Sequence, residues 1–386
     1  MNLKVLVVFG GVSVEHEVSI LSAIQVMSAM PLSYDVLPLY IAKDGTMYYD
    51  ECLCNLETFQ QIDTCIPKLM QVDIQKDKER YFLKQKKGLR KKEIVFDIVF
   101  PVLHGTNGED GSFQGYLKTL GIPFVGCDVL GAAIGQDKEV MKMILQDRGL
   151  PLVPWFCWHK EETDIQLLLE KANRLGYPMI IKPANLGSSI GIGVAHHSEE
   201  LQVCIQEAFR YDHKVLIEKL ITPLREINCA VLGSHSNCKT SVLEEVMKQD
   251  DILSFHDKYE QGSKNQGMAS ATRQIPAQIP NDVKDEIQQY AKESFKALQA
   301  EGVCRIDFLV QKDTLDIYVN EVNTIPGSLA FYLWEQSGIT FSELLEELLQ
   351  LAKIRYRKRQ QLTFTFETNL LTNYALDGKL GKKNKE

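Results

Sequence analysis

Two stretches near the carboxyl end carry alternating polar side chains of the kinds that bind metal ions and anions. Arg305 and Asp307 stand two residues apart in CRIDFLV, and Glu321 and Asn323 stand two apart in LDIYVNEVN. Residues two apart on a β-strand point to the same face, so a hairpin would present two carboxylates, an amide and a guanidinium together. The three oxygen donors suit Mg²⁺, with the arginine beside the ion. A solvated face with a salt bridge is the alternative, and the Pro-Gly pair that follows favours the ligand site because it brings backbone N–H groups close.

A second candidate is the glycine-rich stretch IIKPANLGSSIGIG, residues 180–193. Its small residues can bring backbone amides onto phosphate oxygens, and Lys182 at the end of the preceding strand supplies positive charge. The spacing matches neither the GxxxxGK[ST] nor the GxGxxG phosphate-binding pattern. An ordinary hairpin turn is therefore the alternative to a phosphate site.

Two further polar groups follow apolar strands in the first third of the chain. Glu15 comes just after Gly10-Gly11, at the start of a helical segment, where capping and the helix dipole would account for a carboxylate. His104 and Glu109 crowd the turn in FPVLHGTNGEDG. Taken alone, helix capping and hydrogen bonding within the loop are the favoured interpretations of these groups.

These groups must be positioned by several α/β units. An apolar run at 3–9, a glycine pair and a segment with helical spacing predict a strand, a loop and a helix. Apolar runs at 36–41 and 94–103 continue this pattern. A first α/β domain is expected to end near residue 133.

A second unit is expected to follow a helix that Asp137 caps. Its predicted elements are a helix at 161–175, the strands YPMIIKP and GIGVA, a helix at 198–210 and the strand KVLIEKL. The third unit holds the hairpin described above, a helix at 281–299 and a last helix at 340–353. A polar stretch at 254–275 shows no period, which predicts a long loop that covers the site as a lid.

Composition narrows the class of protein. The chain has 386 residues, of which 45% are hydrophobic and 24% charged, as in soluble globular proteins of two or three domains. A net charge of −8 disfavours nucleic acid as a partner. The apolar run at the amino terminus is too short for a secretory signal or a membrane span, and nine irregularly spaced cysteines without a CxxC pair favour reduced thiols. We therefore expect a cytoplasmic protein that acts on small molecules.

Taken in order, these motifs resemble the ATP-grasp superfamily and, within it, the D-alanine:D-alanine ligase family. The resemblance implies a fold with α/β and α+β parts, in which a preATP-grasp domain precedes a two-subdomain ATP-grasp unit. The implied divisions are a preATP-grasp α/β domain over 1–133, a central lid subdomain over 134–215, a C-terminal subdomain with the catalytic and metal site over 216–352, and a basic extension over 353–386.

The resemblance also implies roles for individual residues. The implied ligands of two Mg²⁺ or Mn²⁺ ions are Asp307, Glu321 and Asn323. The implied ATP-binding residues are Lys138, Lys182, Ser188, Ser189, Glu218, Glu226 and Lys258. The implied D-alanine-binding residues are Glu15, His104, Glu109 and Ser328. The implied catalytic residues are Glu15, Ser188, Tyr259, Arg305 and Gly327.

The implied activity is the ATP-dependent ligation of two D-alanines through an acyl phosphate, for peptidoglycan synthesis, by a homodimer. One segment departs from the family: PGSLAFYLWEQSG is shorter than usual and lacks a His-Ser pair whose serine binds the carboxylate of the second D-alanine. Ser328 is the candidate replacement. The departure leaves a different acceptor, such as D-serine, as an alternative, and a non-catalytic nucleotide-binding protein as a second one.

Overall fold

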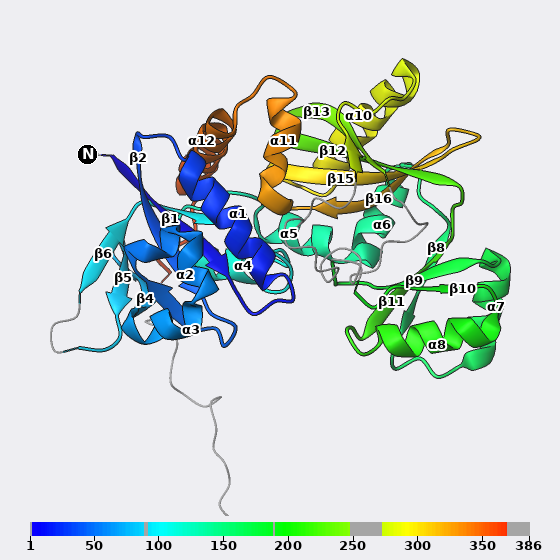
Figure 1. The fold of residues 1–386 in the computed structure, drawn as a ribbon, viewed down its shortest axis with the longest axis horizontal. Coiled ribbons are helices and arrows are strands. Elements are labelled where there is room, and N and C mark those ends of the chain that lie inside the picture. The colour runs from blue at the N-terminus through cyan, green and yellow to red at the C-terminus, as the bar shows by residue number, and fades with distance from the viewer. Residues whose placement is uncertain (1, 89–91, 188–189, 248–271, 369–386) are drawn as a thin grey trace, which may run out of the picture.

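A computed structural model describes residues 2–88, 92–187, 190–247 and 272–368. Three sheets organise these residues, and Figure 1 shows the first sheet in one half of the molecule and the other two in the other half. Most of the expected lid at 254–275 lies outside the described residues. No helix within them is long and apolar enough to cross a membrane.

The amino-terminal sheet has seven strands in the order β6-β5-β4-β3-β2-β1-β7. The strands are β1 (Leu3–Gly10), β2 (Tyr34–Ile41), β3 (Met47–Tyr49), β4 (Met70–Asp77), β5 (Arg80–Gln85), β6 (Glu93–Phe96) and β7 (Ile98–Pro101). The helices of this part are α1 (His16–Ala29), α2 (Leu56–Gln60), α3 (Ile62–Cys65), α4 (Ser112–Thr119) and α5 (Val129–Gln136). Parallel pairing of β1 with β2 and β7 confirms the predicted α/β character.

The apolar run at 94–103 forms two strands rather than one, and β6 and β7 stand at opposite ends of the strand order of this sheet. Asp97 separates them, and its carboxylate accepts a hydrogen bond from the backbone N–H of Lys4 at 2.7 Å. A side-chain contact of this kind competes with regular strand pairing.

The second sheet is antiparallel, in the order β10-β9-β11-β8. Its elements are β8 (Trp155–His159), α7 (Ile165–Leu175), β9 (Met179–Pro183), β10 (Gly193–Ala195), α8 (Ser198–Ala208) and β11 (Lys214–Lys219). The preceding helix α6 (Lys138–Asp147) begins as predicted, because the Asp137 carboxylate accepts from the N–H groups of Glu139 and Val140 at 3.0 and 3.1 Å.

The third sheet is antiparallel, in the order β14-β13-β12-β15-β16. Its elements are β12 (Leu224–Ser234), β13 (Asn237–Met247), β14 (Thr272–Gln274), α10 (Asn281–Ala297), β15 (Gly302–Gln311) and β16 (Ile317–Asn323). The predicted hairpin is confirmed as β15 and β16. Residues 272–274, expected at the end of the lid loop, instead add the edge strand β14 to β13.

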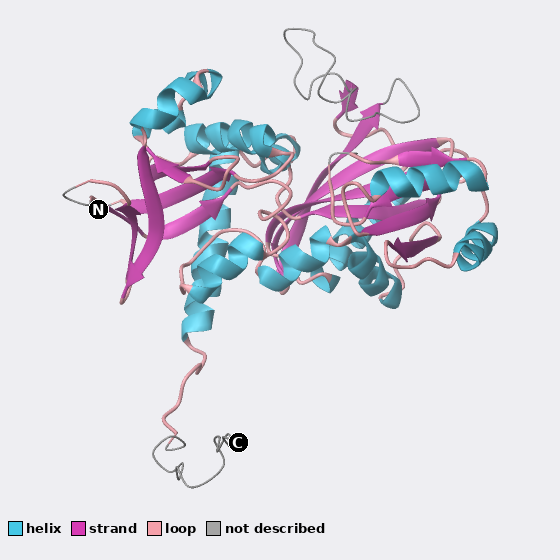
Figure 2. Cartoon of the chain, turned by 90° about the horizontal axis from the view of Figure 1, so that it is seen from below, coloured by secondary structure: helices cyan, strands magenta, loops and turns pink. Residues whose placement is uncertain are grey.

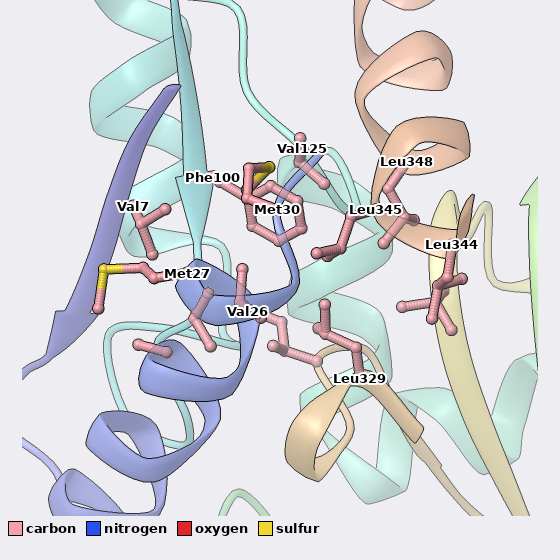
Figure 3. Packing of buried hydrophobic residues seen from close by; sticks show 14 of the residues in the cluster. Val7, Val26, Met27, Met30, Phe100, Val125, Leu329, Leu344, Leu345 and Leu348 are labelled. Atoms are coloured by element: carbon pink, nitrogen blue, oxygen red, sulfur yellow. The ribbon is translucent and has the colours of Figure 1, made fainter. Parts of the chain in front are cut away.

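The last two described helices are α11 (Phe331–Glu335) and α12 (Phe341–Gln360), so the helix expected at 340–353 continues seven residues further. Figure 2 shows helices packed against the sheets in both halves of the molecule. Figure 3 shows Leu329, Leu345 and Leu348 in one buried cluster with Val26 of α1 and Phe100 of β7. The segment after the Pro-Gly pair and α12 therefore share a core with the amino-terminal part. This shared core fixes the position of the amino-terminal part relative to the third sheet.

Candidate functional site

A row of polar side chains crosses one face of the third sheet. This row, one residue from each of four neighbouring strands, consists of Glu244, Asn228, Asp307 and Glu321. Arg305 and Asn323 form the next pair along β15 and β16. Arg305 donates from Nε and Nη2 to the two carboxylate oxygens of Asp307 at 2.6 and 2.7 Å, and Asn323 donates to Asp307 at 3.0 Å. The predicted shared face is confirmed.

The electrostatics of Asp307 favour a bound cation. Burial raises the pKa of Asp307 to about 6; Arg305 opposes this shift, while Glu321 and Glu226 add to it. Within the described ranges, no three His, Cys, Asp or Glu side chains form a metal-binding group. The candidate set thus depends on the amide oxygen of Asn323 as its third donor, a hard oxygen ligand of the kind that Mg²⁺ accepts.

Two lysines of the second unit approach the Glu321 end of the row. Lys182 Nζ donates to the side-chain oxygen of Asn320 at 3.1 Å, one residue before Glu321. Lys138 Nζ lies 3.8 Å from a Glu321 oxygen and donates to the carbonyl of Leu186 at 2.8 Å. Positive charge from α6 and β9 is therefore concentrated beside the candidate metal ligands, where phosphate oxygens could bind.

Glu218 holds this positive charge in place. Its buried carboxylate lies 2.6 Å from both Lys142 and Lys182. Although burial alone would raise it, the two lysines lower the pKa of Glu218 to about 2. Lys142 was not predicted as a site residue, although it stands four residues after Lys138 and thus on the same side of α6. The predicted roles of Glu218 and Glu226 in ATP binding stay predictions.

Glu15 turns away from its own helix. It is the N-cap residue of α1, but its side chain makes no capping hydrogen bond. The carboxylate instead lies against two glycines, since a Cβ added to Gly105 or Gly187 would stand 2.7 or 3.3 Å from a Glu15 oxygen. Helix capping therefore does not account for Glu15, which faces the space between the amino-terminal turn and the glycine-rich stretch.

Glu109 connects that turn to the segment after β16. Its two oxygens accept from the backbone N–H groups of Gly105 at 2.8 Å and Ile325 at 3.0 Å. Burial, together with the nearby charge of Glu15, raises the pKa of Glu109 to about 8. Two carboxyl groups so placed favour a ligand that carries an ammonium group.

His104 contacts α1 at the residue that binds the segment after β16. Its Nε2 lies 3.0 Å from the hydroxyl of Ser22, which accepts from the backbone N–H of Ser328 at 3.0 Å. Burial lowers the pKa of His104 to about 4, so the ring is neutral at pH 7. Ser22 was missed by the sequence analysis, because a buried serine in a helix carries no motif. Gly327 and Ser328 are thereby held against the amino-terminal part, and the role of each stays a prediction.

Four residues with predicted roles, Ser188, Ser189, Lys258 and Tyr259, lie outside the described residues. The others come together from all three parts of the chain. Glu15, His104 and Glu109 come from the first part, the lysines from the second, and the carboxylate row with Arg305 from the third.

Comparison with known proteins agrees with this arrangement. Residues 4–127 match the family profile described as "D-ala D-ala ligase N-terminus", and residues 144–350 match "D-ala D-ala ligase C-terminus". A D-alanine--D-alanine ligase of Thermosipho melanesiensis is 39% identical over 370 residues, which cover 96% of this chain and 98% of the relative.

Two solved structures share the fold. The D-alanine-D-alanine ligase of Coxiella burnetii has a TM-score of 0.79 at 29% identity and covers 93% of this chain and 96% of its own. The VanG D-Ala:D-Ser ligase of Enterococcus faecalis has a TM-score of 0.77 at 30% identity and covers 91% of this chain and 100% of its own. The predicted α/β and α+β ATP-grasp fold is confirmed. With both profiles matched and close to two fifths of its residues shared with a full-length relative, the chain belongs to the D-alanine:D-alanine ligase family.

Proposed function

We propose that the protein joins two D-alanines into D-alanyl-D-alanine while ATP is converted to ADP and phosphate. The observation that carries this proposal is the row containing Asp307 and Glu321, with Arg305 beside it and two lysines at one end, in a chain of this family. The carboxylate of the first D-alanine attacks the γ-phosphorus of ATP and ADP leaves. The amine of the second D-alanine then attacks the acyl phosphate, a proton is lost, and phosphate leaves.

In the first step, Lys138 and Lys182 bind phosphate oxygens, and Asp307, Glu321 and Asn323 would hold two Mg²⁺ or Mn²⁺ ions. When bound, such ions neutralise the charge that builds up on the transferred phosphoryl group. Glu218 keeps Lys182 charged and fixed, because the two form a buried ion pair.

The first D-alanine binds through its ammonium group to Glu15. Glu109 lies close to the carboxylate of Glu15, and His104 contacts α1, which binds the segment after β16. A cation between Glu15 and Glu109 would relieve the repulsion that raises the pKa of Glu109.

In the second step, Arg305 and the backbone N–H of Gly327 stabilise the tetrahedral oxyanion. Although burial alone would lower it, Asp307 holds the pKa of Arg305 well above its usual value, so Arg305 stays charged throughout the reaction. Preorganised charge of this kind stabilises a transition state without reorganisation during the reaction.

We place this reaction in the cytoplasm, as a step of peptidoglycan synthesis by a homodimer. The net charge of −8 supports small-molecule substrates rather than nucleic acid. A second candidate function has the same first step but another acceptor, such as D-serine. The missing His-Ser pair and the similarity to a D-Ala:D-Ser ligase favour this candidate.

The experiment measures phosphate release from Mg²⁺-ATP with D-alanine alone and with a panel of second amino acids, and identifies each product by mass spectrometry. D-alanyl-D-alanine as the preferred product supports the first function. A mixed dipeptide as the preferred product supports the second. No release with any acceptor contradicts both and favours a non-catalytic nucleotide-binding protein.

A further inference from the structure

A polar cluster at the other end of the row has no role in the reaction described so far. Glu244 is fully buried and accepts at Oε2 from Asn228 at 3.0 Å and from the hydroxyl of Tyr332 at 3.1 Å. Its Oε1 lies 3.3 Å from Nη1 of Arg273. The guanidinium of Arg273 also stacks over the ring of Tyr332, 5.1 Å from the ring centroid. We call Arg273, Glu244 and Tyr332 the Arg273 cluster.

The Arg273 cluster lies on the same sheet face as the reacting groups, at the end opposite the lysines. Across the sheet, the row runs from Glu321 through Asp307 and Asn228 to Glu244. Lys138 approaches its Glu321 end. Tyr332 and Glu244 both act on the charge of Arg305, so the cluster and Arg305 are electrostatic neighbours.

This order matches what the second step requires. The acyl carbon must lie near Arg305, and the leaving phosphate must lie towards the lysines and the metal ligands. The attacking amine therefore approaches from the remaining side. An α-amino acid carries its carboxylate one carbon from that amine, and Arg273 is a cation that contacts this end of the row.

Arg273 is suited to a carboxylate ligand. Its side chain is 31% exposed, whereas that of Glu244 is 0% exposed, so the pair is open to a ligand on the arginine side only. A guanidinium has five N–H donors in a planar fork and can bind a second carboxylate beside the one that orients it.

Tyr332 belongs to the segment that lacks the His-Ser pair. Ser328, Leu329 and Ala330 all have left-handed backbones, with φ of 51°, 54° and 51°, and turn the chain from Gly327 directly into α11. Leu329 and Ala330 are buried in the core shared with the amino-terminal part, which stabilises this turn. The shortened segment therefore presents the Tyr332 ring beneath Arg273.

We propose that Arg273, oriented by Glu244 and stacked on Tyr332, binds the carboxylate of the acceptor amino acid. This inference rests on the proposed function and names the acceptor class: an α-amino acid with a free carboxylate. Tyr332 and Glu244 are positioning residues. Arg273 thereby takes over the role of the serine in the missing His-Ser pair, and Ser328, whose backbone N–H donates to Ser22, is not needed for it.

The test compares Arg273→Gln with Arg225→Gln, a matched control. Arg225 of β12 forms a two-point pair with Glu245 of β13 at 2.7 and 2.6 Å, on the sheet face opposite the row and therefore outside the proposed site. Positional isotope exchange in ATP, measured against D-alanine concentration, reports the first half-reaction and the donor site. Phosphate release at higher D-alanine reports the acceptor site, and D-alaninamide serves as an acceptor without a carboxylate.

We expect Arg273→Gln to raise the acceptor KM by about 10- to 150-fold, the effect of losing a charged hydrogen bond. Isotope exchange should be unchanged, and the preference for D-alanine over D-alaninamide should be lost. Arg225→Gln should behave as wild type. If Arg273→Gln does not fold, Arg273→Lys provides the same comparison with a smaller rise.

If the wild type turns over and the Arg273 variant keeps the wild-type acceptor KM and the preference for D-alanine over D-alaninamide, the assignment of Arg273 is wrong. The proposed function would not be affected by that result. The same holds if isotope exchange and phosphate release fall in parallel. A wild-type protein with neither exchange nor release contradicts the proposed function and this inference with it.

Discussion

At the scale of single residues, Arg305 separates a ligase from a nucleotide-binding protein. Its two hydrogen bonds to Asp307 hold the guanidinium rigidly beside the row. We expect Arg305→Lys to lower kcat by about 100- to 1000-fold, because a lysine cannot bind Asp307 at two points and also donate to the oxyanion. ATP affinity should remain. Steady-state kinetics and nucleotide titration measure both quantities, with Arg225→Lys as the control; equal activity in the two variants would contradict the role.

Glu109 should make the stability of the ligand-free protein depend on pH. Its folded-state pKa is raised from 4.5 to about 8, so its contribution is fully present below pH 4.5 and is lost as the pH rises through about 8. The free energy of unfolding of wild type should therefore fall relative to that of Glu109→Gln between pH 5 and 8. Urea titrations at several pH values measure this difference.

The control for this pH dependence is Glu17→Gln, since the side chain of Glu17 is 82% exposed. The hydrogen bond that Glu109→Gln loses changes the offset between the two stability curves but not their slope. Parallel curves for wild type and Glu109→Gln would show that the carboxyl group is not held neutral. D-alanine binding should release a proton, because its ammonium group favours ionised Glu109.

At the scale of elements, the sequence predicts what depends on local spacing. The period of two residues in a strand determined that Arg305 and Asp307 share a face, and a short polar side chain before a helix identified Asp137 as the cap. The spacing of residues along one strand does not predict which residue of a distant strand pairs with them. Glu244 and Arg273 therefore escaped prediction, because their position depends on the pairing of β12, β13 and β14.

The end of α12 shows the same limit. The basic residues from 353 onward predicted an extension, and the boundary at 353 stays a prediction. Helix α12 continues through this run, and Arg355 within it binds other parts of the chain. Arg355 donates to the carbonyls of Gly126 and Phe124, pairs with Glu301 at 2.7 Å and stacks over the Phe124 ring at 4.5 Å. One side chain thus connects the amino-terminal part to the turn before β15.

We expect Arg355→Ala to lower the free energy of unfolding by about 2–3 kcal/mol, because it removes a partly buried charge with several partners. The exposed Arg357 of the same helix is the control, and Arg357→Ala should have no measurable effect. Denaturant titration measures both variants. Similar stabilities would show that the connection through Arg355 contributes little, and that the shared hydrophobic core alone joins the two parts.

At the scale of the whole molecule, the candidate site is assembled from parts that each lack a complete set of groups. Lys138 and Lys182 belong to the second unit, whereas Asp307 and Glu321 belong to the third sheet, and they meet at one end of the row. A bound triphosphate with its metal ion would therefore add contacts between these units. Ligand binding should be visible in the stability of the entire chain.

We expect Mg²⁺-ATP at a hundred times its Kd to stabilise the folded protein by about 2.7 kcal/mol, which raises the Tm of a chain this long by about 3 °C. EDTA should remove most of this shift, because without the metal ion Asp307 and Glu321 repel the phosphates. Asp307→Asn should lose the shift as well, whereas Asp313→Asn, at the exposed turn of the same hairpin, should retain it. Thermal unfolding with each ligand, referred to the ligand-free variant, makes the comparison. An undiminished shift in EDTA would mean that ATP binds through the lysines alone and that the carboxylate row does not hold the metal ion.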